Sequence, residues 1–313
     1  MDRTEITQLA PHLPRGRTLF HYFQDRYALM LLEWALAQRP RRICDLKQTR
    51  WRDLLRKPTV RQALAGARGN VLRAEDVASV WPGRPHVYRL SADVWGLEKG
   101  WQQFWYQNSR PGLNLVLQLN FNSGHDHALR ELLGKGTDFS VPCHPVSQRW
   151  NTLAWSRIDL DWAMGEALIE EVQTDWVRQA RWSWQLVQDF PAGGEREDFV
   201  SAVYGAGVRP EHVGRYVEEI LAPHARVWDE AMLAATLWLL VDVLEIHTIW
   251  IHTPESGYLI KHMDGSPRSI YGRLPRRFGF LKTHEPPRFL RETPHRRVRK
   301  SLSWGPLWQV LRV

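Results

Sequence analysis

The chain has 313 residues, of which 43% are apolar and 24% are charged, so it is long enough to bury a core in one or two domains. Its two cysteines, Cys44 and Cys143, exclude a disulfide framework and a four-cysteine zinc site, and they favour a reducing compartment. The most apolar stretch, residues 231–246, is too short to cross a membrane and contains two acids. Because residues 1–8 also lack the apolar run of a signal peptide, we expect a cytoplasmic protein with no membrane partner.

The net charge of +8 is distributed unevenly along the chain. Residues 1–73 contain 15 basic and 6 acidic side chains, and residues 265–313 contain 12 basic and 2 acidic ones. The segment between them therefore carries a net charge of −11. Two basic flanks around an acidic centre indicate either a polyanionic partner, such as a nucleic acid, or opposite charges that pair within the molecule.

The N-terminal region is predicted to be helical and basic. Apolar residues recur at three- and four-residue steps over residues 17–37, which predicts a helix that ends before Pro40. Shorter helices are expected over residues 45–65 and 74–81, and basic side chains are dense between positions 39 and 61. We therefore treat residues 1–85 as a basic helical N-terminal region.

The pattern changes to mixed elements after residue 85. Strands are expected over residues 86–94, 113–121, 152–160, 167–173 and 248–253, and helices over residues 125–133, 176–190 and 230–246. Residues 191–228 are predicted as a helical insertion, 254–267 as a loop and 269–278 as a short basic helix or turn. This order predicts an α/β (α+β) core domain over residues 86–290, with a mixed, mostly antiparallel sheet flanked by helices. Residues 291–313 are predicted as a basic C-terminal tail that closes with a strand over residues 307–313.

Two adjacent acids, Glu170 and Glu171, interrupt the otherwise apolar strand over residues 167–173. Successive side chains of a strand point to opposite faces, so at least one of these acids is expected to be buried in a central strand. Burial raises the pKa of an unpaired carboxyl, which would suit a general base. The alternative is that the acids pair with structural arginines, for which Arg157 on the preceding strand is a candidate.

One family resemblance rests on the strand over residues 168–173, the helix over residues 230–246, the strand over residues 248–253 and the segment 264–280. That last segment contains Tyr271 and ends with Gly279 between two phenylalanines. The order of these elements resembles the GNAT N-acetyltransferase superfamily. The resemblance implies an N-acyltransferase that uses an acyl-CoA and acts on an amine, possibly one borne on nucleic acid or protein. It also implies that Tyr271 is the general acid toward the departing thiolate, and that Glu170 or Glu171 is the base.

The same resemblance makes acetyl-CoA or another acyl-CoA the expected cofactor. The side chains that it assigns to cofactor binding follow the central strand or the tyrosine. They are Gln173, Arg178, Arg273, Arg276 and Arg277.

A second resemblance rests on the run from Ile169 to Trp176, which reads Ile-Glu-Glu-Val-Gln-Thr-Asp-Trp. This run resembles a motif of the large polyvalent proteins of phages and mobile elements. The resemblance implies one site, and it adds Asp175 to the candidate catalytic residues. The residues of this site are Glu170, Glu171, Gln173, Asp175 and Trp176. The resemblance implies no established reaction.

The C-terminal tail combines positive charge with tryptophans. Phosphate contacts from basic side chains and stacking on Trp304 or Trp308 would suit a nucleic acid. The alternative function is therefore a nucleic-acid-binding protein on a catalytically inactive GNAT-like scaffold. The basic side chains assigned to this contact are Arg296, Arg297, Arg299 and Lys300. We predict no metal site, because His125, His127 and His144 lack an evident third ligand at metal-binding spacing.

Overall fold

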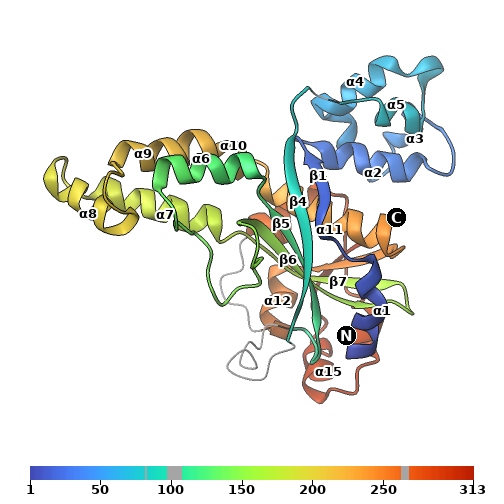
Figure 1. Cartoon of the computed structure of the whole chain (residues 1–313). Coiled ribbons are helices and arrows are strands. Elements are labelled where there is room, and N and C mark those ends of the chain that lie inside the picture. Colours follow the sequence, from blue (N-terminus) through green and yellow to red (C-terminus); the bar gives the residue numbers. More distant parts are fainter. Residues whose placement is uncertain (82, 97–107, 262–267) are drawn as a thin grey trace.

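The computed structural model describes residues 1–81, 83–96, 108–261 and 268–313. Within these residues, eight strands form one sheet in the order β1-β4-β5-β6-β7-β8-β10-β9. Neighbouring strands are antiparallel except for β7 and β8, which are parallel. The fold is a mixed α/β structure with a mostly antiparallel sheet flanked by helices, as the sequence predicts (Figure 1).

The strands of the large sheet differ in length, and the longest ones lie in its first half. Two further strands of two residues each, β2 (Arg41–Arg42) and β3 (Val71–Leu72), form a separate small ladder. The strands of the large sheet are β1 (Arg15–Tyr22), β4 (His86–Trp95), β5 (Asn114–Asn120), β6 (Thr152–Asp161), β7 (Glu166–Gln173), β8 (Thr248–His252), β9 (Leu281–Thr283) and β10 (Trp308–Arg312).

Two groups of helices lie at the upper right (α2 to α5) and upper left (α6 to α10) of Figure 1. The first segment contains α1 (Arg3–Leu9), η1 (Ala10–His12), α2 (Arg26–Leu36), α3 (Ile43–Leu46), η2 (Leu54–Arg56), α4 (Pro58–Gly66), η3 (Arg68–Asn70) and α5 (Ala74–Ala78). The second contains α6 (Ser123–Leu133), α7 (Trp176–Asp189), α8 (Gly194–Tyr204), α9 (Pro210–Arg215), the π-helix η5 (Tyr216–Leu221) and α10 (Ala222–Ala225).

The remaining helices lie at the centre and in the second half of the sheet. A long helix starts as α11 (Trp228–Trp238) and continues as the π-helix η6 (Leu239–Val243). After β8 come α12 (Pro254–Lys261), the π-helix η7 (Ser269–Arg273), α13 (Leu274–Arg277), α14 (Arg288–Arg291) and α15 (Arg296–Leu302). None of the described helices is long and apolar enough to span a membrane.

The two faces of the sheet have different coverings. On one face, α11 packs against β5, β6 and β7, and Ile169 belongs to the large apolar core. We call this the α11 face. The adjacent residue Leu168 points the other way, into a smaller apolar core with Trp250 and Trp308 beneath α12, α14 and α15. We call this second side the α12 face.

The predicted helix over residues 17–37 is wrong in its first third. Residues Arg15–Tyr22 form β1, which pairs with β4, and the helix α2 begins only at Arg26. Phe20 and Tyr22 are buried in the strand, whereas Leu19 beside Phe20 is 51% exposed. This alternation follows the period of a strand, so the helical spacing in this stretch was coincidental. Through β1 the N-terminal region contributes a strand to the large sheet.

A second correction concerns residues 254–267, which we predicted as a loop. Residues Pro254–Lys261 form α12, while residues 262–267 lie outside the described part of the chain. Proline fits the first position of a helix because its missing N–H has no partner there, so Pro254 was a start signal. The predicted strand at the chain's end is confirmed as β10, and it lies inside the sheet between β8 and β9.

Candidate functional site

A β-bulge places the two adjacent acids of β7 on the same side of the sheet. Arg157 pairs with Glu171, but the next residue of β6, Ile158, pairs with Ile169, so Glu170 is an extra residue in β7. Ser156 bonds to Thr236 of α11, so its neighbour Arg157 faces the opposite, α12 face. The expectation that the two acids point to opposite faces is therefore wrong, because the bulge interrupts the alternation.

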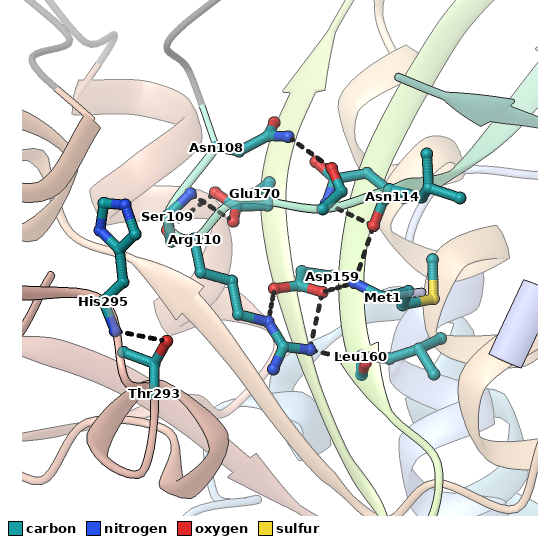
Figure 2. A network of polar contacts seen from close by, with 12 residues as sticks. Met1, Asn108, Ser109, Arg110, Asn114, Asp159, Leu160, Glu170, Thr293 and His295 are labelled. Carbon is teal, nitrogen blue, oxygen red and sulfur yellow. Dashed lines mark hydrogen bonds and ion pairs between the residues drawn. The ribbon is translucent and has the colours of Figure 1, made fainter. Parts of the chain in front are cut away.

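Glu170 lies at the centre of a buried polar cluster. Its carboxylate accepts hydrogen bonds from the backbone N–H of Ser109 at 2.9 Å and from the Ser109 hydroxyl at 3.0 Å (Figure 2). His252 Nε2 lies 3.2 Å and Lys261 Nζ 3.3 Å from one oxygen of this carboxylate, and these three side chains have no exposed surface. Lys261 also donates to the backbone carbonyl of Glu170 at 2.6 Å, so a charged side chain ties α12 to β7.

The electrostatics of this cluster contradict the expectation of a raised pKa. Burial alone would raise the pKa of Glu170, but the charges of Lys261 and His252 and the hydrogen bond from His252 outweigh burial, and the pKa is lowered. A carboxylate that is ionised and saturated with donors has no tendency to take a proton. Glu170 is thus a structural anion and a poor candidate for the base.

Glu171 and Tyr271 are brought together beside this cluster. Glu171 accepts from Arg157 at 2.8 Å, as the alternative reading of the acids predicted, and it is 7% exposed. Burial first, and then the nearby charge of Glu171, raise the pKa of Tyr271 well above its ordinary value, so its hydroxyl stays protonated. Gln309 of β10 donates to the backbone carbonyl of Tyr271 at 2.9 Å and fixes the position of η7.

Asp175 lies in a separate cluster at the start of α7. His144 Nδ1 lies 2.7 Å from its carboxylate, and Trp155 donates to it at 3.1 Å. Gln173 and Arg178 donate to the other oxygen at 2.7 and 2.6 Å. Burial alone would raise the pKa of Asp175, but the hydrogen bonds from His144, Trp155 and Gln173 outweigh it, so the pKa lies below its ordinary value.

The predicted cofactor side chains do not converge on one site. Gln173 and Arg178 are bound to Asp175, and Arg277 forms an ion pair with the buried Glu230. Arg273 and Arg276 are exposed on η7 and α13.

The start of α7 also fits the phosphates of an acyl-CoA poorly. Residues 173–180 contain no glycine that would let the backbone approach a phosphate closely. The ionised carboxylate of Asp175 stands at this helix end and would repel a phosphate. The residues 264–267, which contribute to the family resemblance, lie outside the described part of the chain.

A third buried carboxylate, Asp159, joins three segments of the chain. Arg110 donates two hydrogen bonds to it, at 2.7 and 3.1 Å, and the amino group of Met1 lies 3.1 Å away (Figure 2). Asp159 has no exposed surface, and the Arg110 side chain is 18% exposed. This cluster is saturated with donors in the same way as that of Glu170, so we interpret it as structural.

Two basic surfaces lie outside the sheet. On α15, Val298 is buried and all four basic side chains of the predicted nucleic-acid contact are exposed, with Trp304 next to them at 56% exposure. The second surface is a cavity of about 490 Å³ in the N-terminal helical region. Its lining consists of two leucines and four exposed cations, Lys47, Arg52, Arg56 and Arg61.

Several residues of these clusters were absent from the sequence-based predictions. Ser109 and Lys261 carried no signal, since they lie 61 and 91 positions from Glu170 in the chain. His144 was considered only as a metal ligand, and within the described residues no group of three or more acids, cysteines and histidines could hold a metal ion.

No family model, no curated protein and no solved structure matches the chain.

Proposed function

We propose that this protein binds a nucleic acid through its basic N-terminal cavity and through α15. The cavity carries the proposal, because four cationic side chains line one concavity and no acid is among the described residues that line it with them. Phosphate groups bind such sites through charge and hydrogen bonds, and the two lining leucines offer an apolar surface to a sugar or base.

The second contact adds an aromatic surface. Arg296, Arg297, Arg299 and Lys300 project from one short helix, and Trp304 follows directly. An exposed tryptophan beside several cations can stack on an unpaired base while its neighbours contact phosphates. Because the cavity lies among α3 and α4, at the top of Figure 1, and α15 lies at the bottom, the two surfaces would contact different stretches of one strand.

The test is fluorescence anisotropy with labelled single- and double-stranded oligonucleotides over a range of salt concentrations. We expect the logarithm of affinity to fall linearly with the logarithm of salt concentration, with a slope of about −0.7 to −0.9 per phosphate contact. Replacing Lys47, Arg52, Arg56 and Arg61 by glutamine should weaken binding to all sequences. It should also make the salt slope shallower by about one unit for each phosphate that the protein no longer binds.

A matched control uses four exposed arginines elsewhere, Arg3, Arg17, Arg181 and Arg226. Replacing these by glutamine changes the net charge equally, so their variant should retain most of the affinity. Equal losses in the two variants would mean that net charge alone attracts the nucleic acid. An affinity that does not change with salt would contradict the proposal outright.

Acyl transfer is the second candidate, and the convergence of Glu171 and Tyr271 favours it. The parallel strands β7 and β8 pair only as far as Ile169 and Ile251, so Glu171 follows their last pair and its charge acts on Tyr271 there. The poor fit of α7 to phosphates opposes this candidate. Calorimetric titration with acetyl-CoA and free CoA tests the acyl-transfer candidate. One-to-one binding that Arg273→Gln weakens would support acyl transfer. No heat of binding at millimolar ligand would exclude it.

A further inference from the structure

A cavity of about 520 Å³ lies in the group of helices at the upper left of Figure 1. It is bounded by α7, by the end of α8 and by the loop over residues 135–140, which follows α6. None of the described residues that line it belongs to the clusters above. Its volume falls within the range of roughly 300–1,000 Å³ that is typical of small-molecule sites.

The buried wall of this cavity is formed by packed aromatic rings. The ring of Phe139 is buried, lies nearly parallel to that of Tyr216 at 5.7 Å between centroids, and meets Trp176 edge-on at 5.5 Å. The indole N–H of Trp176 donates to the Tyr216 hydroxyl at 2.6 Å. A hydrogen bond between Ser183 of α7 and Tyr204 of α8 joins the two helices beside the cavity. The packing of the helices therefore forms the cavity in the absence of a ligand.

Helix α7 presents a tryptophan to the cavity. Gln179, Trp182 and Ser183 are three and four positions apart, so they share one face of this helix, and all three line the cavity. Trp182 is 60% exposed, and no described residue stacks on its ring or accepts a hydrogen bond from its N–H. Val203 of α8, which is 53% exposed, adds apolar surface to the same cavity. Exposed apolar groups of this kind mark binding sites when they gather in one place.

The loop over residues 135–140 adds one cation and one acid. Lys135 is exposed and forms no ion pair with the described residues. Asp138 is also exposed, and its two oxygens accept one hydrogen bond each from the backbone N–H and the hydroxyl of Ser140, both at 2.7 Å. An ionised carboxylate offers about four acceptor positions, so Asp138 can accept further hydrogen bonds from a ligand.

These three kinds of group together select the ligand. An indole ring stacks on a nucleic-acid base, a lysine attracts a phosphate, and a carboxylate accepts hydrogen bonds from ribose hydroxyls. An aromatic ligand without phosphate would leave Lys135 without a partner, and a sugar phosphate would leave the ring of Trp182 in water.

We propose that this cavity binds a nucleotide, with the base on Trp182, a ribose hydroxyl on Asp138 and the phosphate at Lys135. Gln179, almost one turn before Trp182 on α7, offers its amide to the edge of the base. The nucleotide is either free or part of a single strand. The site is distinct from the two basic surfaces of the proposed function, since neither contributes to its lining.

The test follows the indole N–H signal of Trp182 in nitrogen-15 NMR spectra of the full chain, where Trp182→Phe identifies it by its loss. Adenosine monophosphate should shift this signal. It should leave the signal of Trp81 unchanged, because Trp81 is 52% exposed but lies outside the cavity. Ribose-5-phosphate, which lacks the base, should not shift the Trp182 signal at the same concentration.

Calorimetric titration of variants separates the three contacts. Trp182→Ala should weaken the binding of adenosine monophosphate by about tenfold or more, whereas Trp81→Ala, the matched control, should not change it. Lys135→Gln should weaken the binding of adenosine monophosphate but not of adenosine. Asp138→Asn should weaken the binding of the ribonucleotide but not of its dideoxy form. The replaced side chains are exposed, so each variant should keep the thermal unfolding midpoint of the wild type.

Anisotropy with a labelled single strand distinguishes the two sources of the nucleotide. Trp182→Ala weakens strand binding if the cavity takes a base of the strand, and it weakens only the binding of the mononucleotide if the cavity takes a free nucleotide. The glutamine variant of the four cations in the N-terminal cavity should bind adenosine monophosphate as the wild type does, so a failure of the proposed function would leave this site intact. A Trp182 signal that responds to neither the mononucleotide nor the strand would overturn the proposal, as would equally tight binding of ribose-5-phosphate.

Discussion

The carboxylates of Glu170 and Asp175 are five positions apart in the chain, yet they lie in clusters of different accessibility. The nearest ionisable side chains to Glu170 among the described residues, His252 of β8 and Lys261 of α12, are fully buried. Asp175 is paired with Arg178, whose side chain is 57% exposed, and with His144, which is 17% exposed and lines a cavity. Similar residues in one motif thus have different surroundings. Glu170 joins elements of the core, whereas Asp175 pairs with side chains that reach solvent.

The largest effect in this comparison is expected from Lys261→Met. The substitution leaves the ionised Glu170 buried without its main counter-charge, which typically costs about 3–5 kcal/mol. Urea unfolding should show this loss as a lower midpoint with an unchanged slope. An effect below about 1 kcal/mol would mean that water or another group compensates the carboxylate, and the description of this cluster as structural would be wrong.

A smaller effect is expected from acid, and it comes from a third cluster, which is made of histidines. Burial, followed by the charges of His86 and His125, lowers the pKa of His224 to about 3. An unfolded histidine titrates near pH 6.5. Between about pH 6.5 and pH 3 the unfolded state therefore binds a proton at this residue and the folded state does not. The stability from this group is complete above about pH 6.5 and is lost as the pH falls toward 3, by roughly 3 kcal/mol at pH 4.

Urea midpoints measured between pH 7 and pH 4.5 report the histidines, because carboxylates titrate mainly below that range. His224 shares this range with His86, His125 and His252, whose pKa values are also lowered by burial. His224→Gln should make the pH dependence in this range shallower than that of the wild type. It should leave the steeper loss at lower pH, which belongs to Glu170 and Asp175. Both pKa values are lowered, so their stabilisation is present at neutral pH and is lost as the pH falls below about 4. A profile of His224→Gln identical to that of the wild type would contradict this assignment.

The smallest effect is expected from Asp175→Asn. The amide keeps one acceptor for its neighbours but loses the charge that attracts His144 and Arg178, at a cost of about 1–2 kcal/mol. Arg288→Gln is the control, since it breaks an exposed pair with Glu292 and should leave the urea midpoint almost unchanged. If Asp175→Asn destabilises the protein as much as Lys261→Met does, the cluster of Asp175 is as important for stability as that of Glu170, which contradicts the comparison.

The fold class was predictable because periodicity within strands and helices is a local property. Residues 113–121 alternate clearly enough to identify β5 and to separate its leucines from Asn114, Gln118 and Asn120. The sequence could not show that this polar face would also be buried, because its cover is the distant loop that Gln118 holds through Pro145. Local periodicity also gave a wrong prediction for β1, where apolar residues happen to recur at helical spacing over a few residues.

The candidate site was predictable only in part, for the same reason. The unusual run from Ile169 to Trp176 drew attention to Glu170, Glu171 and Asp175, and each is indeed buried and paired. Their roles depend on partners that sequence spacing does not reveal. The single extra residue in β7 places Glu170 and Glu171 on the same face, and a bulge of this kind cannot be recognised in the hydrophobic pattern.

The position of β10 has a consequence for how the chain folds during its synthesis. β10 follows both β8 and β9 in the chain, yet it lies between them in the sheet and pairs with both. While the ribosome is still adding residues 284–307, β8 has β7 as its one described sheet neighbour, and β9 has none. Vectorial folding from the N-terminus can therefore complete the sheet only as far as β8, and the final closure must wait until residues 308–312 have emerged.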